Sequence, residues 1–313
     1  MADNVKDNEI VSMDRRSFLK HSVLTSGALL THDLLAQSQH PALKLSLAQW
    51  SLHRALQGEI ISNLEFPGMA RKDYNIEAVE YVNQFFKSAN TDYLSQLLQR
   101  SKDAGVTNHL IMVDEEGPLA LPSDKERLTA VDNHKKWVEA AKYLGCKTIR
   151  VNLHGDGETS AKKTASIDSL SRLGEFAKPM DINIVVENHG SDSSKGSWLV
   201  EVMKGVNKTN VGLLPDFGNF CITHPWGSTE NGCENAYDRY KGIREMLPYA
   251  KGVSAKTYDF DSNGEQPLMD YKKLLDIVKE SGFKGYIGVE FEGASQSEDS
   301  GIRNTIALIK KYW

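Results

Sequence analysis

Eight short apolar runs, each followed by a segment with helical periodicity, constrain the fold of this chain more than any other feature. Their starts are spaced by roughly 30 to 40 residues, which is the size of one strand–helix unit with its loops. The runs cover residues 43–50, 76–82, 108–113, 147–153, 182–187, 210–216, 251–257 and 285–291. Eight such units without an obvious linker predict a single (β/α)8 barrel, the TIM-barrel architecture, over residues 41–313. A doubly wound sheet that binds dinucleotides is disfavoured, because no G-x-G-x-x-G loop follows the first run.

The segments between these runs carry helix signals. Residues 90–105, 132–146, 269–285 and 300–313 have the apolar spacing of amphipathic helices. Asp132 is expected to begin the second of these helices, and Gly145 is expected to end it. The longest irregular stretch, residues 220–240, is predicted to be a functional lid or binding loop.

The first 40 residues are set apart from the barrel. Residues 14–20 read DRRSFLK and are followed by a mildly apolar stretch. This pattern is similar to a twin-arginine export signal, so we expect a periplasmic or exported protein. The alternative interpretation is a disordered basic tail. In either case residues 1–40 are excluded from the fold.

Composition excludes several classes of function. A net charge of −5 without a basic stripe argues against a nucleic-acid partner, and no apolar run is long enough to span a membrane. The oligomeric state is not predicted. Cys221 and Cys233 do not have a zinc-site spacing; they are either free or paired in an oxidising periplasm.

Three carboxylates end three of the apolar runs. They are Glu187 in IVVENHG, Asp216 in VGLLPDFGN and Glu290 in YIGVEFEG. The carboxyl ends of parallel strands meet on one face, where ligands bind. Three carboxylates gathered there either bind a metal ion or titrate abnormally, because like charges repel.

Strand alternation predicts which other residues share this face. If the three carboxylates point inward, so do Val185, Leu214 and Gly288 below them. Ser254 and Lys256 are the corresponding inward residues of the run at 251–257. Asn152 and His154 share one parity and are expected at the same rim.

The assembly of VVENHG, LPDFGN, VSAK and GVEFEG resembles the xylose isomerase-like TIM-barrel family of sugar-phosphate isomerases and epimerases. The resemblance covers about residues 43–313. It implies that a divalent metal ion (Mn, Mg or Co) is bound by Glu187, Asp216 and Glu290, and that Glu187 and Glu290 are the acid/base pair. Endonuclease action on abasic DNA, also known in this superfamily, is disfavoured by the lack of a basic surface.

The fourth metal ligand is where the sequence departs from the family pattern. Where the family reads V-H-A-K, this chain reads VSAK, so Ser254 takes the place of the histidine. A hydroxyl is a weaker ligand than imidazole. Two outcomes remain open. A hard ion can persist on three carboxylates and the Ser254 hydroxyl, or the Lys256 ammonium can take the cation's place.

The sequence therefore predicts a sugar isomerase or epimerase that removes a proton beside a carbonyl, acting on a non-phosphorylated sugar or derivative. Lys256 and His189 are further catalytic candidates. Candidate substrate contacts are Glu80, Trp50, Asn152, His154 and Trp226. Two alternatives stay open: a lyase or hydrolase acting on 3-keto-glycosides, and a metal-free barrel that only binds sugars.

Overall fold

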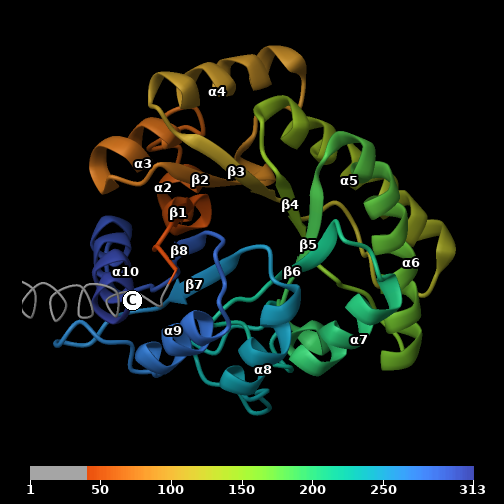
Figure 1. Cartoon of the computed structure of the whole chain (residues 1–313). Coiled ribbons are helices and arrows are strands. Elements are labelled where there is room, and N and C mark those ends of the chain that lie inside the picture. Colours follow the sequence, from red (N-terminus) through yellow and green to blue (C-terminus); the bar gives the residue numbers. More distant parts are fainter. Residues whose placement is uncertain (1–40) are drawn as a thin grey trace, which may run out of the picture. The chain divides into compact units, whose positions relative to one another are not determined.

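The structure is a computed structural model that describes residues 41–313. The predicted export signal at residues 1–40 lies outside the described residues. Eight parallel strands alternate with helices, as the sequence predicts, and Figure 1 shows the helices around the outside of the strands. The strands are β1 (Leu45–Ala48), β2 (Ala78–Val82), β3 (Thr107–Met112), β4 (Thr148–Val151), β5 (Asn183–Glu187), β6 (Val211–Leu214), β7 (Val253–Thr257) and β8 (Ile287–Phe291).

The helices follow the strands on the outside of the sheet. They are α2 (His53–Gln57), α3 (Phe66–Tyr74), α4 (Thr91–Asp103), α5 (Asp124–Leu144), α6 (Thr159–Ala177), α7 (Gly196–Val206), α8 (Arg239–Met246), α9 (Tyr271–Glu280) and α10 (Glu298–Tyr312). Short 3-10 helices are η1 (Gln49–Leu52), η2 (Asn83–Phe85), η3 (Lys178–Met180), η4 (Ser191–Ser194) and η5 (Leu247–Tyr249). Within residues 41–313, none of the helices combines the length and the apolar character that a bilayer crossing needs.

Local sequence signals set most helix ends. α4 begins after Asn90, whose side chain accepts a hydrogen bond from the Tyr93 amide, and α9 begins after Asp270 in the same way. The expected start of α5 at Asp132 is wrong, because the helix already begins at Asp124 after Ser123. Acidic residues in that first turn suit the helix dipole. The end of α5 at Gly145, which has a φ of 80°, is as predicted.

The strands form a closed ring. Their hydrogen-bonded order is β6-β5-β4-β3-β2-β1-β8-β7, and isolated parallel bridges join the two ends. One of these bridges pairs Asp216 with Ser254, where the Ser254 amide donates to the Pro215 carbonyl at 2.9 Å. The seam between β6 and β7 therefore places a predicted metal ligand beside the position that lacks a histidine.

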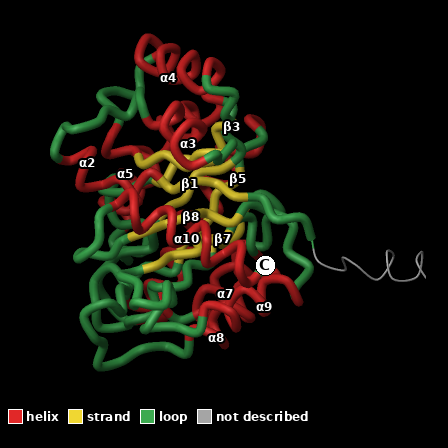
Figure 2. The backbone as a smooth tube through the Cα atoms, turned by 90° about the vertical axis from the view of Figure 1, so that its left-hand side faces the viewer, coloured by secondary structure: helices red, strands yellow, loops and turns green. Residues whose placement is uncertain are grey.

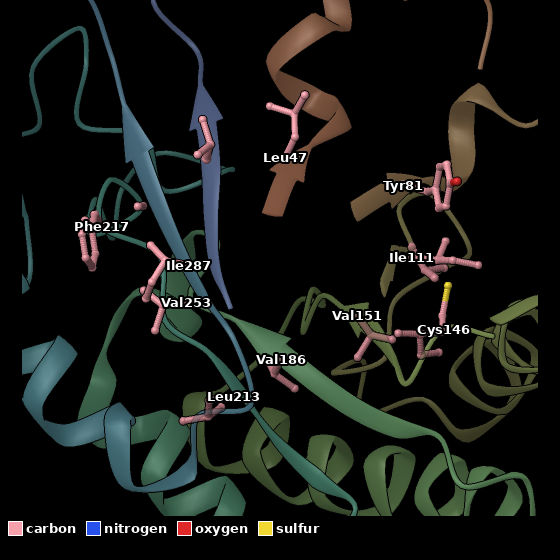
Figure 3. Close-up of a cluster of buried hydrophobic side chains, with 14 of the residues drawn as sticks. Leu47, Tyr81, Ile111, Cys146, Val151, Val186, Leu213, Phe217, Val253 and Ile287 are labelled. Atoms are coloured by element: carbon pink, nitrogen blue, oxygen red, sulfur yellow. The ribbon is translucent and has the colours of Figure 1, made fainter. Parts of the chain in front are cut away.

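Alternate side chains of the strands form two separate apolar layers. Ala48, Val82, Leu110, Met112, Val185 and Leu214 pack together inside the ring. Strand residues such as Val151, Val186 and Leu213 belong to the larger core (Figure 3). The strands lie at the centre of the barrel with helices outside them (Figure 2). This confirms the predicted inward direction of Val185 and Leu214, and the side chains that follow at their strand ends share one pocket.

Candidate active site

Glu187, Asp216 and Glu290 meet at the carboxyl ends of β5, β6 and β8. Each offers one oxygen, and these oxygens all lie within 4.8 Å of one another. All three residues are buried, with exposed fractions of 2%, 0% and 4%. The convergence predicted from the strand ends is therefore present in the structure. Its electrostatic cost must be offset by cations close by.

Lys256 is the first of these cations. Its Nζ lies 3.6 Å from Asp216 Oδ2, 3.5 Å from Glu290 Oε1 and 3.3 Å from Glu292 Oε2. Burial works to lower the pKa of Lys256, but the surrounding carboxylates outweigh it and raise that pKa well above its usual range. The ammonium is therefore charged, and it neutralises part of the negative charge of the carboxylates.

Arg150 on β4 is the second cation, and it was not among the site residues predicted from the sequence. Its Nε lies 2.9 Å from Glu187 Oε2, and its Nη1 donates to Asp114 Oδ1 at 2.6 Å. Arg150 shares strand parity with Asn152, which was expected at the rim, so the same alternation would have placed it inward. Asp114 directly follows the strand-like run at 108–113 and could have been found as another strand-end carboxylate.

The two oxygens of Asp216 have different surroundings. Oδ1 accepts hydrogen bonds from the Gly218 and Asn219 amides at 2.7 and 2.8 Å, which fixes the turn after β6. Oδ2 has no hydrogen-bond partner among the described residues. Burial raises the pKa of Asp216 to about 6, and Lys256 opposes that rise.

Glu187 is held at its other oxygen by an amide. Asn219 Nδ2 donates to Glu187 Oε1 at 3.2 Å, and Asn219 Oδ1 accepts a hydrogen bond from Lys256 Nζ at 3.1 Å. The Asn219 amide therefore connects Glu187 to Lys256. Burial raises the pKa of Glu187 well above its usual range, although Arg150 and Lys256 lower it in part. Glu187 is thus a carboxyl group that tends to hold a proton.

The residues present fit a divalent cation. Asp216 Oδ2 is buried without a hydrogen-bond partner among the described residues, as expected of an atom that can bind a ligand, whereas Glu187 Oε2 is paired with Arg150 Nε at 2.9 Å. Among the described residues, five carboxylates (Asp114, Glu187, Asp216, Glu290 and Glu292) are paired with two cations, Lys256 and Arg150, so this part of the cluster retains negative charge. Oxygen ligands of this kind suit hard ions such as Mg²⁺ or Mn²⁺.

A cavity of about 480 Å³ opens above this cluster. Glu290, Glu292, Arg150 and His189 bring polar groups to its wall, and Trp50 and Trp226 bring aromatic rings. We call it the main cavity. Its size is within the range of small-molecule sites, and a mixed aromatic and polar wall suits sugars.

Trp226 lies in the loop between β6 and α8, within the stretch predicted to be a binding loop. It is half-exposed and lies against two histidine rings, His154 at 5.1 Å and His189 at 5.5 Å. Burial lowers the pKa of both histidines, so both rings are neutral near pH 7. A disulfide between Cys221 and Cys233 closes this loop, which settles the open question about these cysteines.

Three predicted substrate contacts do not line the main cavity. Asn152 and His154 lie beside a smaller neighbouring cavity. Glu80 is 1% exposed and accepts a hydrogen bond from Ser46 Oγ inside the barrel. A Cβ atom at Gly288 would lie 3.0 Å from Glu80 Oε1, so glycine there makes room for this carboxyl group. Burial raises the pKa of Glu80 to about 7.

Residues 70–312 match the family described as "Xylose isomerase-like TIM barrel". Among curated proteins, the chain is 21% identical over 268 residues to the 3'-dehydrocarminate deglycosidase alpha subunit of a Microbacterium species, covering 64% of this chain and 73% of that subunit. It is 24% identical over 218 residues to the inosose isomerase of Bacillus licheniformis, covering 61% and 72% of the two chains. A local match, 36% identical over 67 residues, reaches the C-glycoside deglycosidase alpha subunit of Arthrobacter globiformis and spans 21% of this chain and 19% of that subunit's length.

Two solved structures show the same fold at low identity. The IolI protein with a bound zinc atom superposes with a TM-score of 0.66 at 16% identity, over 87% of this chain and 99% of that chain. The 3-keto-D-glucoside 4-epimerase YcjR of E. coli gives a TM-score of 0.64 at 13% identity, over 86% of this chain and all (100%) of that chain.

Proposed function

This chain belongs to the xylose isomerase-like TIM barrel family, and from that premise we propose that it removes a proton from the carbon beside a sugar carbonyl, as sugar isomerases and epimerases do. The observation that carries the proposal is the convergence of Glu187 and Glu290 in one buried carboxylate cluster, from which Glu290 lines the main cavity. Two carboxyl groups in unlike surroundings are the arrangement that acid/base chemistry needs.

The two glutamates have different positions, which suggests different roles. Glu290 lines the main cavity, and its two oxygens are positioned by Ser254 and Lys256, so it is the candidate base. Glu187 has a raised pKa and is the candidate acid. Arg150 lines the same cavity and supplies positive charge where the carbonyl oxygen becomes negative.

A divalent ion, if bound, would be held by Glu187, Asp216 and Glu290, with the Ser254 hydroxyl beside them. Such an ion polarises a carbonyl oxygen as a Lewis acid. Elemental analysis of the purified protein decides whether it is present. Stoichiometric Mn, Mg, Co or Zn would support the ion-dependent form, whereas activity without metal would assign the cationic role to Lys256 and Arg150.

The substrate we propose is a non-phosphorylated sugar or sugar derivative in the periplasm. Two cysteines joined by a disulfide fit an oxidising compartment, which supports the proposal of export. Fractionation of cells that express the full chain tests this part: the protein should be recovered with periplasmic markers, and substitution of Arg15 and Arg16 by lysine should retain it in the cytoplasm.

A second candidate is supported by the similarity to deglycosidase alpha subunits. In a 3-keto-glycoside the same proton removal at C2 can expel the aglycone from C1: the C2–H and C1–O bonds break, a C1–C2 double bond forms, and the oxygen leaves with the aglycone. The acid that protonates this oxygen would again be Glu187. Both candidates share the first step and differ in its outcome.

One experiment tests the shared step and separates the two outcomes. The protein is incubated in D2O with a free ketose, and separately with a 3-keto-glycoside, and the products are followed by NMR. Deuterium at the carbon beside the carbonyl shows proton removal, an epimer indicates the first candidate, and released aglycone indicates the second. Glu290→Gln should lower the exchange rate by about 10²-fold or more, whereas Glu139→Gln, an exposed control on α5, should not change it.

A barrel that only binds sugars would give no deuterium exchange with either substrate. Exchange that persists undiminished in Glu290→Gln would also overturn the assignment, because the base would then lie elsewhere.

A further inference from the structure

A smaller cavity adjoins the main cavity at Trp226. It encloses about 220 Å³ and is lined by the segment between β3 and α5, by Asn152 and His154 after β4, and by Trp226. We call it the side pocket. Trp226 and Glu115 line both spaces, so the two cavities meet at these side chains. Ligand sites usually enclose roughly 300–1,000 Å³, so the side pocket suits one part of a ligand whose remainder lies in the main cavity.

Asn152 offers the side pocket an unpaired acceptor. The residue is 7% exposed, and its Nδ2 donates to Asp114 Oδ1 at 2.6 Å. Because a carboxylate only accepts hydrogen bonds, the amide must turn its nitrogen toward Asp114. Asn152 Oδ1 is then left without a hydrogen-bond partner among the described residues, although it is buried. A hydroxyl group of a ligand would satisfy it.

His154 and Trp226 give the side pocket a fixed aromatic wall. The two rings pack edge to face at 5.1 Å, and Trp226 is half-exposed despite this contact. His154 Nε2 is another buried atom without a hydrogen-bond partner among the described residues. An aromatic face beside two unsatisfied polar atoms matches a ring that carries both C–H surface and hydroxyl groups.

We propose that the side pocket is a subsite for a second, hydroxylated ring, so that the preferred ligand is a glycoside and not a free monosaccharide. The inference rests on the proposed function only in placing the reacting sugar ring in the main cavity. Trp226 then stands where the glycosidic link passes from one space to the other. The second ring can be a sugar or a phenol, since both present a ring face and hydroxyl groups.

Pro118 allows a test that leaves the main cavity unchanged. It lines the side pocket but not the main cavity, and it is partly exposed. Pro118→Phe places a ring into the side pocket, and Pro118→Ala controls for loss of the proline. Isothermal titration calorimetry with the full chain gives the Kd of glucose, cellobiose, phenyl β-D-glucoside and 4-hydroxyphenyl β-D-glucoside. None of these carries the ketone, so the measurement does not depend on turnover.

The wild-type protein should bind cellobiose or 4-hydroxyphenyl β-D-glucoside at least about tenfold more tightly than glucose, and the tighter of the two identifies the second ring. Phenyl β-D-glucoside, which cannot donate to Asn152, should bind more weakly than its hydroxylated counterpart. Pro118→Phe should abolish the preference for glycosides without changing the Kd of glucose, and Pro118→Ala should retain it.

Equal affinities for glucose and all glycosides, or a preference that survives in Pro118→Phe, would overturn the subsite. This result is separable from failure of the proposed function. A glycoside preference that depends on the side pocket, in a protein that gives no deuterium exchange, would uphold the subsite and reject the enzyme. Deuterium exchange without any preference for glycosides would reject the subsite and uphold the enzyme.

Discussion

Ser254 Oγ donates a hydrogen bond of 2.6 Å to Glu290 Oε2, which joins the position where the family pattern has a histidine to one of the three clustered carboxylates. The serine therefore positions the candidate base. It also leaves the cluster with oxygen ligands alone, and this favours hard ions over zinc-type ions. A single side chain thus influences both the acid/base geometry and the choice of cation.

Ser254→His should restore an imidazole at this position. Because imidazole binds transition-metal ions more strongly than a hydroxyl group, we expect zinc to bind at least about tenfold more tightly than to the wild type. Calorimetric titration of metal-stripped protein with zinc measures the change. Ser254→Ala is the matched control: it loses the bond to Glu290 without gaining a ligand, and its zinc affinity should not rise. Equal zinc affinity in the histidine and alanine variants would contradict a fourth ligand position here.

Lys256→Met should destabilise the protein. Lys256 is 1% exposed and its ammonium lies within 3.6 Å of three carboxylates, so removing the ammonium leaves buried charges without compensation. Breaking a buried ion pair in this way typically costs about 3–5 kcal/mol. Urea unfolding gives the free energy of unfolding, and Lys204→Met, on an exposed position of α7, serves as control. A loss as small as that of the control would show that the carboxylates are already protonated or otherwise balanced.

The fold and the three carboxylates were predictable because they depend on strand alternation. Once the eight strand-like runs are recognised, and with them the carboxylates at the ends of three of the runs, the parallel ring itself brings Glu187, Asp216 and Glu290 together. The start of α5 was not predictable from Asp132, since Ser123 and the acidic turn after it offer an equally good N-terminus further upstream.

The cations and the depth of each side chain were harder to predict. Arg150 lies within an otherwise apolar run, and its role as a buried cation can be recognised only once its partners Asp114 and Glu187 are known. Glu80 was expected to contact the substrate, yet it lies inside the barrel, where Gly288 on β8 leaves space for it. Such depth depends on contacts between strands that are far apart in the sequence.

The disulfide should stabilise the loop that carries Trp226. Cys221 and Cys233 are 12 residues apart in the sequence, and a closed loop of this size contributes about 3 kcal/mol. The double variant Cys221→Ser/Cys233→Ser should lose about this much and raise the KM more than it lowers kcat, because the loop shapes the main cavity. Unfolding with and without reductant provides the control: only the wild type should respond. A wild type insensitive to reductant would mean that the cysteines are not paired.

The buried Glu80 should make stability depend on pH. Burial raises the pKa of Glu80 from its ordinary 4.5 to about 7, and the hydrogen bond from Ser46 opposes that rise. The folded protein therefore binds more protons than the unfolded chain between these values, so the free energy of unfolding contributed by Glu80 falls as pH rises through this window. A pKa change from 4.5 to about 7 corresponds to about 3 kcal/mol.

Glu80→Gln keeps the side chain neutral at every pH and removes this loss. The variant should resemble the wild type near pH 4.5 and exceed its free energy of unfolding by up to about 3 kcal/mol above pH 8. Urea unfolding at both pH values measures the difference, with Glu139→Gln on the exposed face of α5 as the control, whose difference from the wild type should stay small at both. If the difference between Glu80→Gln and the wild type is the same at the two pH values, Glu80 does not take up a proton on folding, and its carboxylate must be paired with a cation inside the barrel.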